Sequence, residues 1–413
     1  MTDQLRQEFD ATRAQSIRNC EPLQAEDFAL QAEAFTSPPK WHLAHTTWFF
    51  ETFLLKPWLT GYTTPEPLYE VMFNSYYNGI GEQFPRPRRG LLSRPTLDEV
   101  LDYREQVNTG VAQLLCDTGH PHHADILARV TLGIEHEKQH QELFFTDLKY
   151  SLHHNPLLPA YTSQSLAPAS EPEPLQWHAF EGGLVEIGHH RTDFCFDNEL
   201  PRHTCFLQPF ELAHRLVTNR EFQAFIDDGG YRQPNLWLAD GWEVVQREGW
   251  NAPLYWLQRD GAALEYTLHG VQALEPEYPV CHVSAYEADA YARWAGARLP
   301  SEQEWEMAAP EVQASADNST YHPSPSRSGG NLDQLYTDCW QWTRSAYAPY
   351  PGYRASADAI GEYNGKFMSN QLVLRGGSCV SSAGHVRRSY RNFFYPPDRW
   401  QFTGIRLARD SGA

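Results

Sequence analysis

The stretch "LARVTLGIEHEKQHQELFFTDLKYSL", residues 127–152, decides the fold of the N-terminal half of the chain. Its apolar residues recur at intervals of three and four, which is the spacing of one buried face of an α-helix. Residues four apart on a helix lie ~40° apart around its axis, so His136 and His140 share one face. We favour a metal site for these two imidazoles, and the alternative is a pair of ordinary, partly buried histidines.

The pentapeptide "HEKQH", residues 136–140, also fits the H-E-x-x-H pattern of zinc proteases. In that pattern Glu137 would be the general base, and a third ligand would follow. The extended form of the motif requires Gly and His where this chain has Leu143 and Thr146. The next glutamates fall in a proline-rich stretch, so the protease interpretation lacks a metal ligand.

A third ligand is available upstream, in "SPPKWHLAHTTWFFETFLL", residues 37–55. Ser37 is expected to cap a helix that opens at Pro38 and Pro39 and carries His42 and His45. Two helices would then face each other across the ion. Three histidines leave coordination positions open, which is typical of a catalytic site, and both Zn(II) and Fe(II) fit this ligand set.

The chain divides into two parts of different character. Residues 1–152 contain helical patterns, among them 96–117 with a capping box at Thr96 and Glu99, and predict a bundle of about four long helices. Residues 153–176 are rich in proline and predict a linker. Residues 177–413 predict an irregular α+β domain of short segments rich in Gly, Trp and Tyr. Only two helices are expected there, at 218–230 and 284–296, each between a Ser or Thr cap and Gly.

Composition narrows the class of protein. A chain of 413 residues favours two domains, and 33 Lys plus Arg against 52 Asp plus Glu give a formal net charge of −19. This charge repels phosphate backbones and anionic membrane surfaces, so neither nucleic acid nor a membrane is an expected partner. The polar N-terminus and the absence of a long apolar run favour a cytoplasmic protein.

A basic loop lies between the two histidine-bearing segments. "FNSYYNGIGEQFPRPRRGLLSRP", residues 73–95, concentrates arginine and tyrosine in an acidic chain. Its guanidinium groups could bind the carboxylate of a substrate. The alternative is a solvated loop whose arginines pair with surplus acids.

Taken together, "KWHLAHTTWFFET", the 73–95 loop and "HEKQHQELF" resemble the DinB-type bundle of the sulfoxide synthases of ergothioneine biosynthesis. The second half resembles the formylglycine-generating-enzyme domain of these enzymes, an irregular C-type-lectin-like fold, through "VTNREFQAFI", "DCWQWT", "LRGGSC" and "GIRLAR". The resemblance covers nearly the whole chain. It implies a non-haem iron(II), dioxygen-dependent enzyme that joins the sulfur of cysteine or γ-glutamylcysteine to the imidazole of hercynine.

The resemblance also implies roles for particular residues. The iron ligands map to His45, His136 and His140, which leaves His42 without a role. Further roles fall on residues that touch substrate: Arg86 and Arg89 for the carboxylate of the thiol, Gln139 for the hercynine imidazole, Phe393 and Phe394 for its trimethylammonium group, and Tyr77, with Tyr76 beside it, as proton or hydrogen-atom donor. Their spacing alone predicts that the two phenylalanines belong to the core of the second domain.

One departure from the pattern of formylglycine-generating enzymes limits what is carried over. Their copper-binding cysteine pair is missing from "SYRNFFYPPDRW", so formylglycine chemistry is not expected and the second domain is interpreted as binding substrate. Alternatives to the sulfoxide synthase are a related C–S or C–Se bond-forming enzyme such as a selenoneine synthase, a three-histidine zinc hydrolase, and a bundle with structural histidines.

Overall fold

The computed structural model describes residues 2–166, 174–190, 193–311, 320–327, 329–357 and 359–412. They form two compact units. The helical unit contains Met1–Tyr161 and Ser356–Tyr363, and the mixed unit contains Thr162–Ala355 and Asn364–Ala413. Part of the predicted linker, 167–173, lies outside the described residues.

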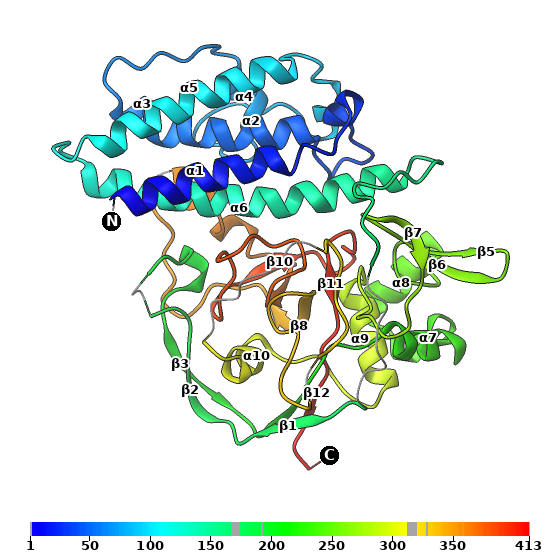
Figure 1. The fold of residues 1–413 in the computed structure, drawn as a ribbon. Helices are drawn as coiled ribbons and strands as arrows, with labels where there is room; N and C mark the ends of the chain where they lie inside the picture. Colours follow the sequence, from blue (N-terminus) through cyan, green and yellow to red (C-terminus); the bar gives the residue numbers. More distant parts are fainter. Residues whose placement is uncertain are drawn as a thin grey trace. The chain divides into compact units, whose positions relative to one another are not determined.

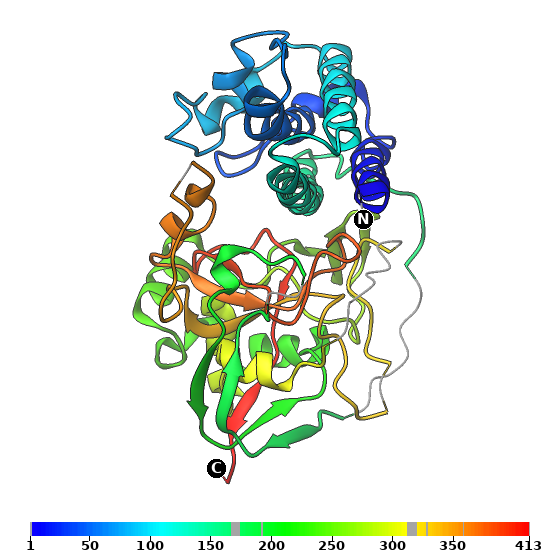
Figure 2. The ribbon, with the colours of Figure 1, turned by 90° about the vertical axis from the view of Figure 1, so that its left-hand side faces the viewer.

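Four long helices build the helical unit, which confirms the predicted bundle (Figure 1). They are α1 (Thr2–Arg18), α2 (Pro39–Phe50), α5 (Leu97–Cys116) and α6 (His123–His153). α2 packs against both α5 and α6, and α1 packs against α6; Figure 2 views α1, α2 and α6 nearly end-on. The shorter helical segments are η1 (Ala25–Ala29), η2 (Glu51–Leu55), α3 (Lys56–Trp58), α4 (Tyr69–Phe73), η3 (Arg86–Leu91) and η7 (Ala359–Glu362).

The starts of α5 and α2 are fixed in different ways. At α5 the predicted capping box is confirmed, because Thr96 Oγ1 accepts from Glu99 N at 3.2 Å and Glu99 Oε2 accepts from Thr96 N at 2.6 Å. At α2 the prediction that Ser37 caps the helix is wrong: the N-cap is Pro38, without a side-chain cap. Ser37 instead donates its backbone N–H to Asp147 Oδ2 at 2.8 Å and accepts from Arg89 Nη1 at 2.9 Å. These tertiary hydrogen bonds replace the local one.

A glycine allows α2 and α6 to approach closely. Gly133 lies one turn before His136 on α6, and a Cβ placed there would lie 2.4 Å from a ring carbon of Phe50 on α2. Because real Cβ atoms do not come so near an aromatic ring, any larger residue would push the two helices apart. Gly133 therefore sets the helix separation beside the histidines.

The mixed unit holds twelve strands within its described residues, arranged in four small sheets whose orders are β1-β4-β12, β10-β9-β8-β11, β2-β3 and β5-β6-β7. The pairs are antiparallel except β11 with β8, which is parallel. The strands are β1 (Trp177–Phe180), β2 (Gly183–Ile187), β3 (His203–Leu207), β4 (Phe210–Ala213), β5 (Trp256–Arg259), β6 (Ala262–Thr267), β7 (Gly270–Ala273), β8 (Trp340–Ala346), β9 (Leu372–Arg375), β10 (Asn392–Phe394), β11 (Thr403–Gly404) and β12 (Ala408–Asp410). This irregular α+β architecture confirms the predicted class.

Two of the four α-helices described in the mixed unit were predicted, and two were missed. α7 (Asn219–Asp227) and α9 (Ala285–Trp294) follow the expected caps at Thr218 and Ser284. The expectation of only two helices is wrong, because α8 (Ala239–Glu248) and α10 (Glu302–Ala308) are also present. The remaining segments are short 3₁₀ turns: η4 (Asp197–Glu199), η5 (Gly230–Arg232), η6 (Pro234–Leu236) and η8 (Gly365–Phe367).

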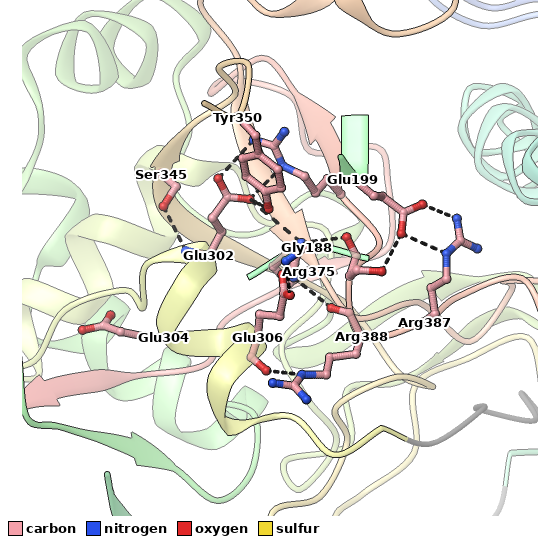
Figure 3. A network of polar contacts seen from close by, with 12 residues as sticks. Gly188, Glu199, Glu302, Glu304, Glu306, Ser345, Tyr350, Arg375, Arg387 and Arg388 are labelled. Atoms are coloured by element: carbon pink, nitrogen blue, oxygen red, sulfur yellow. Dashed lines mark hydrogen bonds and ion pairs between the residues drawn. The ribbon is translucent and has the colours of Figure 1, made fainter. Parts of the chain in front are cut away.

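A buried network of charges ties α10 to the sheets of the mixed unit (Figure 3). From α10, Glu302 accepts from Arg391 Nε at 2.8 Å, and Glu306 pairs with Arg375 of β9. Next to them, Glu199 accepts from Arg387 Nε at 2.9 Å. Since removing one partner of a buried ion pair costs several kcal/mol, this network fixes the relative position of these segments.

Candidate metal centre

Three histidines from two facing helices lie together in the helical unit. His45 comes from α2, and His136 and His140 come from α6. One side-chain nitrogen of each histidine lies within 4.8 Å of those of the other two. The structure thus brings together the three histidines to which the family resemblance assigns the role of ligands.

The ring nitrogens are arranged as metal ligands would be. His45 Nε2 lies 3.2 Å from His136 Nε2, and His45 Nδ1 donates to the carbonyl oxygen of Phe73 at 2.5 Å. Nitrogens ~2.1 Å from one ion and at right angles to each other lie ~3.0 Å apart. The observed separation fits two ligands of one ion, and neutral imidazoles suit zinc, iron, copper and nickel.

Burial keeps these imidazoles neutral. It lowers the pKa of His136 to about 3. Burial also lowers the pKa of His45 well below its usual value, and nearby His136 lowers it further. The pKa of His140 is lowered well below its usual value in the same way, by burial and by nearby His45. Burial opposes the charged form of an imidazole, and each neighbouring imidazole adds to the effect. At neutral pH all three therefore keep a lone pair for a metal.

Two of the candidate ligands each stack on the face of an aromatic ring. Trp41 stacks on His45 with ring centroids 4.6 Å apart and planes 9° apart, and Phe49 stacks on His136 at 4.3 Å and 28°. His136 Nδ1 is buried and has no hydrogen-bond partner within the described residues. The orientation of His136 therefore depends on packing rather than on a hydrogen bond.

Glu137 points away from the histidines into an ionic cluster. Its carboxylate accepts from Arg13 Nη1 at 2.9 Å and from Ser16 Oγ at 2.5 Å, and it pairs with Arg104. Burial raises the pKa of Glu137, but Arg104 and Arg13 outweigh it and bring the value to about 2. A carboxylate held in this way is a poor general base, so the arrangement disfavours the zinc-hydrolase interpretation.

Tyr76 and Tyr77 lie in the loop that follows α4. Tyr77 is fully buried, and its ring centroid lies 5.0 Å from that of Phe53 and 6.5 Å from that of Phe49, the residue that covers His136. The two tyrosine hydroxyls are 3.5 Å apart. Burial, followed by the neighbouring Tyr76, raises the pKa of Tyr77 well above its usual value. Tyr77 thus retains its proton.

The two predicted substrate arginines differ in their surroundings. Arg86 is exposed and donates to the carbonyl oxygen of Phe35. Arg89 is 2% exposed, and its guanidinium carbon lies 3.4 Å from the ring centroid of Trp41. Within the described residues Arg89 forms no salt bridge, and its Nε has no hydrogen-bond partner. Burial lowers the pKa of Arg89 well below its usual range, and nearby Arg86 adds to this.

Gln139 is contacted by a segment from far along the chain. Tyr363 donates its hydroxyl to Gln139 Oε1, and the Tyr363 ring centroid lies 5.7 Å from that of His136. Next to it, Glu362 accepts from the backbone N–H of Gly79 at 2.6 Å. Sequence reasoning missed both residues, because no local pattern in 356–363 indicates contact with a helix more than 200 positions earlier.

Phe393 and Phe394 belong to the mixed unit, on β10. The Phe393 ring stacks on Tyr347 with centroids 4.0 Å apart and planes 10° apart, whereas the Phe394 ring lies edge-on to Trp400 at 5.9 Å. Both phenylalanines are partly exposed. The Phe393 ring also lies 5.9 Å from that of Phe367, at 25°. The role of both phenylalanines in binding a cation stays a prediction.

Among the described residues, no helix combines the length and apolar character needed to cross a membrane.

Comparison with known proteins assigns both halves of the chain to families. Residues 8–144 match the DinB superfamily, and residues 167–328 and 319–411 match the sulfatase-modifying factor enzyme 1-like domain. Hercynine oxygenase of Mycobacterium tuberculosis is 31% identical over 99% of both chains. Hercynine oxygenase of Mycolicibacterium thermoresistibile is 31% identical over 92% of this chain and 89% of that protein. Ergothioneine biosynthesis protein 1 of Schizosaccharomyces pombe is 23% identical over 54% of this chain and 29% of that protein.

Proposed function

Because this chain belongs to the hercynine oxygenase family of ergothioneine-biosynthesis sulfoxide synthases, we propose that it is an iron(II)- and dioxygen-dependent enzyme that forms a C–S bond on hercynine. The thiol sulfur comes from cysteine or γ-glutamylcysteine. The observation that carries the proposal is the cluster of His45, His136 and His140, whose side-chain nitrogens lie within 4.8 Å of one another. When bound there, Fe(II) would supply a redox centre with open positions for a thiolate and for dioxygen.

The buried guanidinium of Arg89 supports binding of an anionic substrate. A buried charge without an ionic partner costs several kcal/mol, and a substrate carboxylate would offset that cost. Arg89 packs on Trp41, which in turn stacks on His45. A carboxylate held by Arg89 would thus leave the thiol of a small amino acid near the histidines. Arg86, at the exposed edge, would bind the same substrate.

The imidazole and the cation of hercynine call for different partners. An amide such as Gln139 can hydrogen-bond an imidazole without competing for the metal. A trimethylammonium group has no N–H to donate, so aromatic faces such as Phe393 and Phe394 suit it, at roughly 0.5 to 2 kcal/mol per contact. In this proposal residues 1–152 carry the metal, 153–176 form the linker, and 177–413 supply the aromatic residues.

Tyr77 is the proposed donor of a proton or hydrogen atom, with Tyr76 beside it. The support is that Tyr77 is fully buried and keeps its proton at every physiological pH. Its ring lies in the aromatic cluster that contacts His136. Donation by Tyr77 would favour C–S bond formation over simple oxidation of the thiol.

The test is product analysis with the full chain. The protein is reconstituted anaerobically with Fe(II), exposed to oxygen with hercynine plus either cysteine or γ-glutamylcysteine, and its products are analysed by mass spectrometry. We expect an adduct of the two substrates that gains one sulfoxide oxygen, with one thiol preferred. Formation of disulfide alone, with hercynine recovered unchanged, would contradict the proposal.

A further inference from the structure

His42 is a buried histidine outside the ligand cluster, one turn before His45 on α2. Its Nδ1 lies 2.9 Å from Nδ1 of His140, and its Nε2 lies 3.2 Å from Oδ2 of Asp147. His140 and Asp147 lie two turns apart on α6, so they share a face. His42 therefore reaches across from α2 and links a predicted metal ligand to a buried carboxylate.

The chemistry of these groups fixes the direction of each hydrogen bond. Oδ2 of Asp147 already accepts from the backbone N–H of Ser37 at 2.8 Å, and a carboxylate oxygen only accepts. Nε2 of His42 must therefore carry the proton and donate to Asp147. In the tautomer that carries its one proton on Nε2, His42 has its lone pair on Nδ1 and accepts from Nδ1–H of His140. The lone pair of His140 is left on Nε2, which is the nitrogen free to bind a metal.

The three predicted ligands are thus supported in three different ways. His45 donates to a neutral backbone carbonyl, that of Phe73. His136 is oriented by packing on Phe49. Within the described residues, His140 is the one of the three from which a chain of hydrogen bonds leads to a carboxylate. A carboxylate behind a ligating imidazole fixes its tautomer and raises its basicity.

We propose that Asp147 and His42 form a relay that positions His140 and strengthens it as a metal ligand. His42 and Asp147 are positioning residues, because they act on the metal through His140. This inference rests on the metal centre of the proposed function. It assigns a role to the fourth histidine of the site, and it explains why Ser37 is used to hold Asp147 rather than to cap α2.

The test measures Co(II) affinity of the full chain without substrates, by visible absorption and competition with a chelator. For H42F we expect the Kd for Co(II) to rise ~10- to 100-fold, the usual effect of losing a partner behind a ligand. D147N, which keeps the shape but loses the charge, should raise Kd less. H42Q should recover most of the affinity, because its amide can accept from His140 and donate to Asp147.

Q141M is the matched control on the same helix. Gln141 is buried beside His140, and its amide donates to Thr12 O at 2.9 Å and to Ser16 Oγ at 3.0 Å, both on α1. Q141M should lower thermal stability and leave the Kd for Co(II) unchanged. Near-UV circular dichroism of each metal-free variant checks the fold.

The outcomes separate the two claims. If the wild-type chain binds no Co(II), both the proposed metal centre and the proposed relay are contradicted. The relay is wrong, and the metal centre stands, if the wild type binds Co(II) and the three folded variants H42F, D147N and H42Q all bind it as tightly as the wild type. A loss of affinity in Q141M equal to that in H42F would also overturn the relay, because it would indicate general damage to the helix.

Discussion

At the scale of single residues, the contacts of Arg89 connect this proposed substrate-binding group to His45, a candidate metal ligand. Arg89 covers one face of Trp41, and Trp41 stacks on His45, which stacks further on Trp48 at 5.5 Å and 17°. The positive charge is therefore held in place by aromatic packing, and within the described residues no salt bridge neutralises it. Such a residue is prepared to receive an anion.

Replacing Arg89 should change the KM values of the two substrates to different extents. In R89M we expect the KM for the thiol to rise ~10- to 100-fold, because charge-assisted hydrogen bonds worth about 1.5 to 3 kcal/mol are lost. The KM for hercynine should change little. Steady-state kinetics with each substrate varied in turn measures this. R88M is the control, since Arg88 is exposed on the same 3₁₀ turn. An equal rise for both substrates would mean that the loop has misfolded.

Replacing Tyr77 and Tyr363 one at a time should distinguish donation of a proton or hydrogen atom from binding of hercynine. Y77F is expected to shift turnover from sulfoxide toward oxidised thiol, because it removes the hydroxyl of the proposed donor. Y363F loses the hydrogen bond to Gln139 and should raise the KM for hercynine without changing the product ratio. Mass analysis of both products gives the partition. If Y363F alone changes the ratio, Tyr363 is the donor instead of Tyr77.

The sequence could predict the histidines of the centre but not how they are supported. A spacing of four on an amphipathic helix places His136 and His140 on one face whatever surrounds them. The role of Ser37 could not be predicted, because the competing partners, Asp147 and Arg89, come from other segments. The same holds for His42, whose partners both lie on another helix.

At the scale of elements, the contact between α2 and α6 sets the geometry of the centre. The helices meet where Gly133 faces Phe50. Because His45 lies on one of these helices and His136 and His140 on the other, a change in helix separation changes the distances between ligands.

Enlarging Gly133 should weaken metal binding as well as stability. For G133A we expect a loss of about 1 to 3 kcal/mol in the free energy of unfolding, from overpacking, together with weaker Co(II) binding. G110A is a suitable control, because Gly110 lies on α5, which carries none of the three histidines, and a Cβ there would meet the flexible side chain of Leu55 on η2. Denaturant unfolding and Co(II) titration measure the two effects. Unchanged Co(II) affinity in G133A would show that helix separation does not control the centre.

The charged network around α10 predicts a pH dependence. Burial raises the pKa of Glu199, but Arg387 and the hydrogen bond from Ser389 outweigh it and lower the pKa below its usual value. A lowered folded pKa means that Glu199 stabilises the fold above the unfolded pKa of about 4.5 and loses this contribution as pH falls below it. E199Q should therefore cost roughly 3 kcal/mol at pH 7, a difference that shrinks as pH falls below about 4.5.

Denaturant unfolding of E199Q and wild type at several pH values measures this difference. E211Q is the control, since Glu211 pairs with Arg409 at a partly exposed position on β4 and should cost much less. A cost of E199Q that stays constant from pH 7 to acid would contradict the account.

Of the four α-helices described in the mixed unit, two could be predicted from local patterns and two could not. α7 and α9 begin at Ser or Thr caps with Glu in the first turn, and both were expected. α8 begins after Leu238 without a side-chain cap, so nothing marks its start. α10 does carry a capping box, Ser301 and Glu304, but at seven residues it is too short for helical periodicity to be visible.

At the scale of the whole molecule, the sequence predicted the two classes of unit because helical periodicity ends near residue 152. It could not predict that Ser356–Tyr363 joins the helical unit. That return depends on contacts between distant segments, such as Glu362 with Gly79 and Tyr363 with Gln139. The candidate centre is therefore completed by a segment from the second half of the sequence.

The most direct test of the central claim compares metals in the same protein. The metal-free chain is loaded with Fe(II) or with Zn(II), and oxygen consumption is recorded as hercynine and the thiol are added singly and together. We expect oxygen uptake only with Fe(II) and only when both substrates are present. Turnover with Zn(II), or oxygen uptake with Fe(II) that does not depend on hercynine, would contradict it.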